Sequence, residues 1–103
     1  ANARELWDAG IIYGFGTDSD FPPQEALSHE LDALGQFFSN EETFMILTKN
    51  AALAARRDDA LGTLDRGKFA DILILDGNPL ADIESVFNIQ VVIKTGRIVV
   101  DNR

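Results

Sequence analysis

Residues 61–76 read LGTLDRGKFADILILD, and the pattern of the chain changes along this stretch. Within it, residues 72–75 form an apolar run in which isoleucine alternates with leucine. Because no polar residue interrupts the run, it predicts a strand that is buried on both faces. Turn-forming glycine and aspartate residues flank the strand. We therefore expect β-structure from here to the end of the chain.

The second half contains four candidate strands, each bounded by turns that contain glycine or aspartate. They are residues 61–64, 70–76, 91–94 and 97–100. Thr95 and Gly96 separate the last two candidates and predict a tight hairpin turn between them.

The first half begins with another strand candidate, residues 11–16, which read IIYGFG. β-Branched and aromatic side chains dominate this run, and the turn-prone sequence TDSD follows it at residues 17–20. The pattern predicts a buried strand that ends at a loop.

An amphipathic helix is expected next, because Pro22 and Pro23 suit a helix start. Apolar residues then recur at steps of three and four, which places them on one helical face. These residues are Leu27, Leu31, Leu34 and Phe38.

Two shorter helices should follow. Ser39 and Glu42 have the spacing of a capping box, which predicts a helix start at this point. Thr48 can cap another helix, rich in alanine at residues 51–55, that ends near Arg57. The small side chains of this helix would let a neighbouring backbone approach it closely.

A helical first half and a stranded second half indicate either one α+β domain or the seam between two domains. We expect the seam at residues 58–60, which divides the chain into residues 1–60 and residues 61–103.

Composition limits the possible functions. The 103 residues are 46% hydrophobic, which is enough to bury a core, and their formal net charge is -8. This charge would repel phosphate backbones and anionic lipids, so we expect neither nucleic acid nor a membrane as a partner. No apolar run approaches the roughly 18 residues of a membrane span. The absence of cysteine excludes Cys-ligated zinc and is compatible with a reducing cytoplasm, the location that we favour.

Four short motifs occur in order along the chain. They are Gly16-Thr17-Asp18-Ser19, Thr48-x-Asn50-Ala51-Ala52, Leu61-Gly62-Thr63-Leu64-x-x-Gly67-Lys68-x-Ala70-Asp71-Ile72 and Asn78-Pro79-Leu80. Together they resemble the C-terminal end of the amidohydrolase superfamily, and within it the imidazolonepropionase-like and prolidase-like members. The resemblance extends over nearly the whole chain.

The resemblance implies an α+β fold made of two parts. Residues 1–60 would hold the last strand, residues 11–16, and the C-terminal helices of a (β/α)₈ barrel. Residues 61–103 would supply strands of the small β-sandwich that flanks such a barrel. Lys68 and Asp71 would then have structural roles.

The resemblance also implies a metal-dependent hydrolase that uses metal-activated water to cleave a C–N bond of an amide, cyclic amide or dipeptide. Asp18 would lie at the C-terminal end of the barrel strand, where such barrels build their active sites. It would either ligate a divalent metal, which we expect to be zinc, or accept the proton from metal-bound water. A carboxylate can do both. Without the resemblance, an aspartate in a Thr-Asp-Ser turn is more often a residue that bonds its own backbone.

His29 and Glu30 are further candidates, as substrate-binding residues, because members of the family carry a similar pair near this position. The alternative is a surface histidine beside the apolar face of the helix.

The metal site cannot be complete in this chain. A catalytic zinc site takes about three protein ligands, whereas the chain contains 1 histidine. A barrel of this type needs about 250 residues. The chain also begins with Ala1 rather than methionine. We therefore expect a C-terminal fragment of a longer enzyme, inactive and without metal on its own, whose substrate is a small molecule.

The competing hypothesis is a self-standing α+β module that binds or assembles without catalysis. A severed barrel piece should expose the edge of residues 11–15 and self-associate through it. A self-standing module should instead be a monomer with a protected edge.

Overall fold

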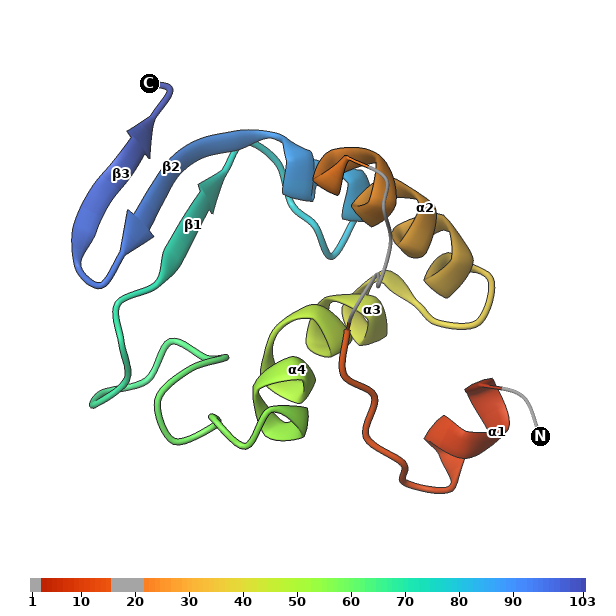
Figure 1. Ribbon diagram of the computed structural model, residues 1–103. Helices are drawn as coiled ribbons and strands as arrows, with labels where there is room; N and C mark the ends of the chain where they lie inside the picture. The colour runs from red at the N-terminus through yellow and green to blue at the C-terminus, as the bar shows by residue number, and fades with distance from the viewer. Residues whose placement is uncertain (1–2, 16–21) are drawn as a thin grey trace.

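The computed structural model describes residues 3–15 and 22–103, and every structural statement below concerns these residues. Helices occupy most of the first half, and an antiparallel sheet occupies the end of the chain (Figure 1). The elements are α1 (Ala3–Asp8), α2 (Pro23–Gly35), α3 (Asn40–Leu47), α4 (Lys49–Ala54), β1 (Ile72–Leu75), the 3-10 helix η1 (Ile83–Phe87), β2 (Ile89–Lys94) and β3 (Arg97–Asp101).

Helix α2 confirms the predicted amphipathic helix. Pro22 precedes it and Pro23 is its first residue, where the missing N–H of proline has no cost. Leu31 and Ala26 are buried, and α2 packs against α3. Phe38 lies beyond the end of the helix but is also buried, so it extends the same apolar surface.

Helix α3 begins with the predicted capping box. The Ser39 hydroxyl accepts a hydrogen bond from Glu42 N at 3.1 Å, and the Glu42 carboxylate accepts one from Ser39 N at 3.0 Å. The same carboxylate accepts two hydrogen bonds from Arg4 Nη1, at 2.7 and 2.9 Å. Glu42 thus starts α3 and also attaches α1 to it.

The expectations for α4 were partly wrong. Thr48 occupies the N-cap position, but its hydroxyl donates to Phe44 O at 2.8 Å and does not cap the helix. The helix ends at Ala54, before the predicted end near Arg57. Arg56 adopts a left-handed conformation, and Arg57 N donates to Ala52 O at 2.8 Å. This pairing closes the helix early and satisfies its last carbonyls.

An aromatic cluster joins α1 to the rest of the helical half. The rings of Trp7, Tyr13 and Phe38 contact one another, with centroids 5.2 to 6.5 Å apart. The Tyr13 hydroxyl also donates to Ala3 O at 3.1 Å. The segment that follows α1 is therefore held at Tyr13 both by ring contacts and by a hydrogen bond.

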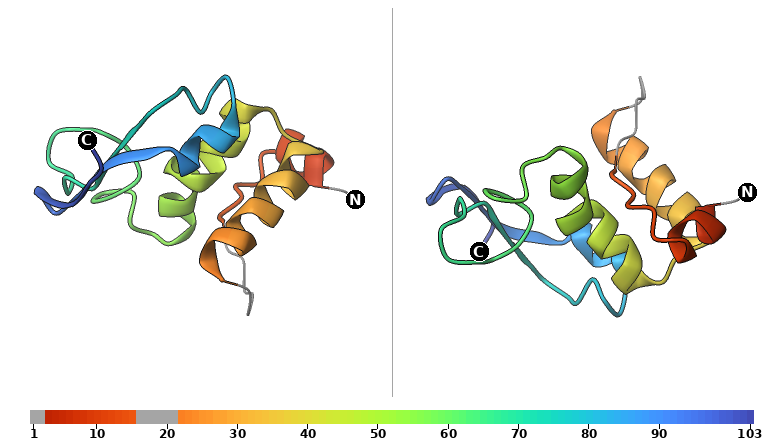
Figure 2. Two further views of the ribbon diagram at one scale, coloured as in Figure 1. Left: turned by 90° about the horizontal axis from the view of Figure 1, so that it is seen from above. Right: turned by 90° about the horizontal axis from the view of Figure 1, so that it is seen from below.

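Of the strand predicted at residues 11–16, the structure describes residues 11–15, which form no strand and include no buried residue. Ile11 and Ile12 are 51% and 54% exposed. A strand needs a neighbouring strand for its backbone hydrogen bonds. The described sheet lies at the opposite end of the molecule from α1 and this segment (Figure 2).

The sheet has the order β1-β2-β3, and both pairings are antiparallel. Three of the four candidate strands and the predicted hairpin turn are confirmed. Thr95 and Gly96 both have positive φ angles, of 50° and 78°, as the twist of a two-residue hairpin requires.

Residues 61–64 are not a strand; they belong to a loop that Lys68 holds together. Its ammonium donates to Thr63 Oγ1 at 2.8 Å, and Phe69 N donates to Ala60 O at 2.9 Å. Asp71 then fixes the hairpin turn, because it accepts hydrogen bonds from Lys94 Nζ at 2.7 Å and Thr95 N at 2.9 Å. These contacts agree with the structural roles expected for Lys68 and Asp71.

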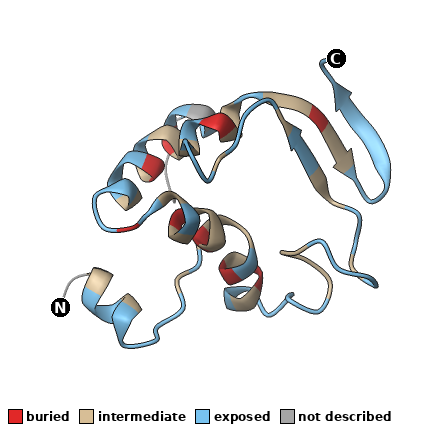
Figure 3. Ribbon diagram, turned by 180° about the vertical axis from the view of Figure 1, so that it is seen from behind, coloured by how far each residue is buried: buried red, intermediate tan, exposed pale blue. Residues whose placement is uncertain are grey.

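The prediction that residues 72–75 are buried on both faces was wrong. Leu73 and Ile74 are 54% and 47% exposed, and every residue of β3 is exposed. The described buried residues gather in the helical part, with Val91 as the buried residue of β2 (Figure 3). Among the described elements β1 packs mainly against its neighbour β2 and the short helix η1, which leaves the side chains of Leu73 and Ile74 uncovered.

The Glu42 carboxylate makes the stability of the fold dependent on pH. Hydrogen bonding from Arg4, and then from Ser39, holds the pKa of Glu42 below its ordinary value of 4.5. A lowered folded-state pKa stabilises the fold above the unfolded-state value, and this contribution is lost as the pH falls through the folded-state pKa. Glu42→Gln should therefore lower the free energy of unfolding at pH 7 and reduce its loss below pH 4.5.

Urea unfolding of both proteins across this pH range measures the effect. Glu41→Gln is the matched control, because Glu41 is exposed in the same helical turn. Equal acid dependence in wild type and Glu42→Gln would mean that the ion pair does not stabilise the fold.

Candidate functional site

Asp18, the main predicted site residue, lies outside the described residues, together with the rest of its motif at residues 16–19. Its role as ligand or base therefore stays a prediction. The described chain leads to it from residues 11–15 and resumes at Pro22, immediately before α2.

His29 and Glu30, the predicted substrate-binding pair, lie within α2. His29 is exposed, and Glu30 is half-buried. As consecutive residues of a helix they point about 100° apart around its axis. The described geometry does not bring the two side chains to one point.

The described residues contain no group of three or more His, Cys, Asp or Glu side chains that could hold a metal ion. A catalytic zinc site takes about three protein ligands. The donor set in the described part of the chain therefore does not fit a catalytic metal by itself, and no chemical step through a metal follows from it. Across the same residues, no helix is long and apolar enough to cross a membrane.

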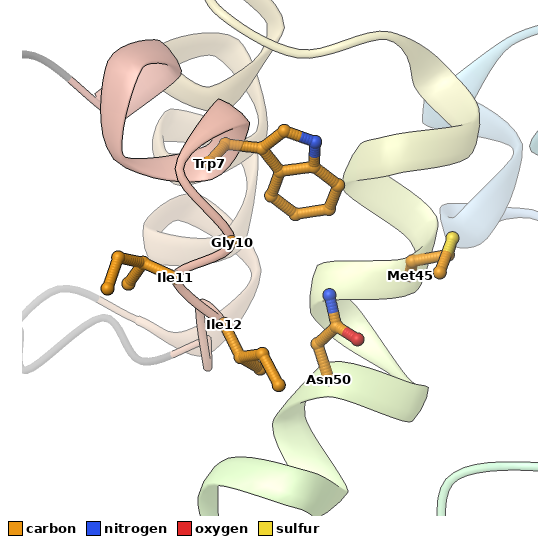
Figure 4. A pocket seen from close by; sticks show the side chains of 6 residues that line it. All are labelled: Trp7, Gly10, Ile11, Ile12, Met45 and Asn50. Carbon is orange, nitrogen blue, oxygen red and sulfur yellow. The ribbon is translucent and has the colours of Figure 1, made fainter.

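A pocket of about 200 Å³ lies between the end of α1 and the helices α3 and α4 (Figure 4). Five of its lining residues are apolar or glycine, and the sixth is an asparagine. They are Trp7, Gly10, Ile11, Ile12, Met45 and Asn50.

The pocket forms because the chain turns back sharply after α1. Gly10 has a φ angle of 92°, a left-handed conformation that glycine adopts without strain. Gly10 N then donates to Trp7 O, and Ile11 N donates to Leu6 O, each at 3.0 Å. The turn directs residues 11–15 along α4.

The same segment approaches α4 very closely. A Cβ atom added at Gly14 would lie 2.7 Å from Ala54 Cβ. This contact explains why the alanine-rich helix and the glycine occur together, as expected from the small side chains of residues 51–55.

Asn50 is the polar group of the pocket. Asn50 is 7% exposed, and no side-chain nitrogen or oxygen of the described residues is both buried and without a hydrogen-bond partner. Figure 4 shows its amide directed toward the space between Trp7 and Ile12. No sequence pattern predicted a pocket at this position, although Asn50 belongs to the motif Thr48-x-Asn50-Ala51-Ala52.

Comparison with known proteins identifies the family. The sequence matches the Amidohydrolase family over residues 1–99. It is 35% identical over 82 residues to an imidazolonepropionase from Thermoanaerobacter pseudethanolicus, a match that covers 74% of this chain and 19% of the relative.

Solved structures give the same result. A putative prolidase from Bifidobacterium longum superposes with a TM-score of 0.84 and 37% identity, over 94% of this chain and 25% of that one. A Xaa-Pro dipeptidase with bound methionine in its active site superposes with a TM-score of 0.80 and 28% identity, over 92% and 24% of the two chains.

The 103 residues thus span about a fifth to a quarter of the length of these relatives. The order of motifs, the arrangement of helices and sheet, and the family match over residues 1–99 agree with one another. The chain belongs to the amidohydrolase family.

Proposed function

We propose that this chain is the C-terminal part of a longer metal-dependent amidohydrolase. In that protein residues 11–16 form the last strand of a (β/α)₈ barrel, and the helices up to residue 60 follow it. Residues 61–103 form part of a composite β-sandwich beside the barrel. The exposed isoleucines 11 and 12 and the uncovered sheet support this assignment, because each is an apolar surface that a further layer would bury.

The longer protein is proposed to hydrolyse a C–N bond in a small amide, cyclic amide or dipeptide. The observation that carries the proposal is the family match over residues 1–99, together with relatives described as imidazolonepropionase and prolidase. A divalent metal, which we propose to be zinc, would supply activated water at neutral pH. Its remaining ligands would come from outside these 103 residues.

Asp18 is proposed to ligate the metal or to take up the proton of the attacking water. The segments on both sides of it are attached to the helical half, since Tyr13 is held by its ring contacts and hydroxyl, and Pro22 leads directly into α2. His29 and Glu30 are proposed to contact the substrate from α2. The 103 residues alone are proposed to be inactive and to bind no metal.

The partner is proposed to be a small molecule and not nucleic acid or a membrane. The formal charge of -8 supports this, because it repels polyanions. A cytoplasmic location is also proposed, because a chain without cysteine is compatible with a reducing compartment.

Asp18→Asn in the longer protein should lower kcat by at least about 10²-fold, since it removes a charged ligand or proton acceptor. Initial rates on a dipeptide and on a cyclic amide, with metal content measured in parallel, test this. Asp32→Asn is the control, because Asp32 is an exposed carboxylate of α2. Near-normal turnover of Asp18→Asn would exclude the proposed role.

The isolated 103-residue chain is proposed to self-associate through exposed strand edges. Apolar residues are exposed both at residues 11–12 and along β3. Light scattering at micromolar concentration should give a mass above 11.3 kDa, and Ile11→Lys should reduce it. A monomeric mass for the wild-type chain would favour the alternative, a self-standing, non-catalytic binding or assembly module.

A further inference from the structure

Helix α4 lies between two glycines that approach it very closely. An added Cβ atom at Gly14 would lie 2.7 Å from Ala54 Cβ. One added at Gly62 would lie 2.6 Å from Ala52 Cβ. The two alanines are two residues apart, which places them about 200° apart around the helix axis. The segment that contains Gly14 and the loop that contains Gly62 therefore lie on opposite sides of α4 (Figure 1).

The contact at Gly62 keeps α4 from moving away from Gly14. An added Cβ atom at Gly62 would also lie 3.2 Å from Thr48 O, and Ala52 is buried. The helix packs against α3 as well. Packed interiors have few voids, so a shift of α4 away from Gly14 would press Ala52 against Gly62.

Tyr13, the residue before Gly14, is also held in place. Its ring contacts those of Trp7 and Phe38, and its hydroxyl donates to Ala3 O at 3.1 Å. A methyl group at Gly14 would therefore displace the chain that follows Tyr13. Carbon atoms in van der Waals contact are about 3.5–4.0 Å apart, so relieving a distance of 2.7 Å requires a displacement of about 1 Å.

We propose that Gly14 and Ala54 are positioning residues for the reaction of the longer protein. Their contact sets the distance between α4 and the chain that continues to Asp18, four residues after Gly14. A misplacement of about 1 Å can cost about 10²-fold in rate. The inference rests on the proposed function, because it requires Asp18 to act in catalysis, but it gives neither Gly14 nor Ala54 a contact with the substrate.

Gly14→Ala in the longer protein tests the proposal. The φ angle of Gly14 is not left-handed, so alanine is not strained there by its backbone, and among the described residues its methyl group meets Ala54. The variant should lower kcat by about 10²-fold and leave KM unchanged, because the substrate still binds while a reacting group is misplaced. Initial rates on a dipeptide and on a cyclic amide measure this, and the melting temperature of the same sample shows whether the variant is folded.

The double variant Gly14→Ala/Ala54→Gly separates positioning from a general loss of stability. It moves one methyl group from the helix to the facing segment, so the fit returns and most of the lost kcat should return with it. Ala54 is the last residue of α4, so a glycine there does not interrupt the interior of the helix. Gly35→Ala is the matched control and should leave kcat unchanged, because no described atom lies within 4 Å of an added Cβ atom at Gly35.

Wild-type kcat in Gly14→Ala would overturn the proposal, as would equal losses in Gly14→Ala and the double variant. If Gly14→Ala does not fold, Ala54→Val enlarges the same contact from the helix side and should lower kcat; an unchanged kcat would then overturn the proposal. A wild-type longer protein that hydrolyses neither substrate would refute the proposed function itself. An active wild type with unaffected variants would refute this inference alone.

Discussion

The Glu42 carboxylate is the contact on which the arrangement of the helical half depends. It accepts hydrogen bonds from the backbone at the start of α3 and from Arg4 of α1, at 3.0 Å and at 2.7 and 2.9 Å. One side chain therefore starts a helix and attaches another that lies far away in the sequence. The position of α1 in turn sets where the chain turns at Gly10 and where residues 11–15 run along α4.

The second constraint is that this chain has more apolar surface than its own described residues can cover. Both sheet edges and residues 11–12 remain exposed, while the buried side chains collect around α2, α3 and α4. Membership of a family whose compared members are about four times as long gives a physical reason, since the missing layers would come from the rest of such a protein. The uncovered sheet and the exposed side chains of Ile11 and Ile12 then have one common explanation.

The features that could be predicted from the sequence are those that depend on residues close together in the chain. The capping box joins residues three apart, the face of α2 repeats along one helix, and the hairpin at Thr95 and Gly96 needs two residues in left-handed conformations. Apart from the cap and the end of α4, the wrong expectations concerned burial and pairing with distant residues. Strands at residues 11–16 and 61–64 were expected from composition, but residues 11–15 have no neighbouring strand within the described part of the chain, and residues 61–64 are held in a loop by Lys68.

In the candidate site, too, the sequence identified local motifs but not the contacts between distant segments. The order of four short motifs sufficed to identify the family, yet Asp18 is outside the described residues and the metal ligands are not gathered in the described ones. The ion pair between Arg4 and Glu42 and the pocket at Asn50 were not expected, because each joins segments far apart in the sequence, and helix α1 was not expected either. For α1 a local signal existed, the Arg4 and Asp8 pair one helical turn apart.

The most direct test of the account is the mass of the native polypeptide in the cells that produce it, detected with an antibody raised against residues 1–103. The account predicts a band several times larger than 11.3 kDa, as expected for a protein that includes the rest of the barrel and of the sandwich. A native band at 11.3 kDa would contradict it, because the chain would then act alone and the exposed surfaces would need another explanation.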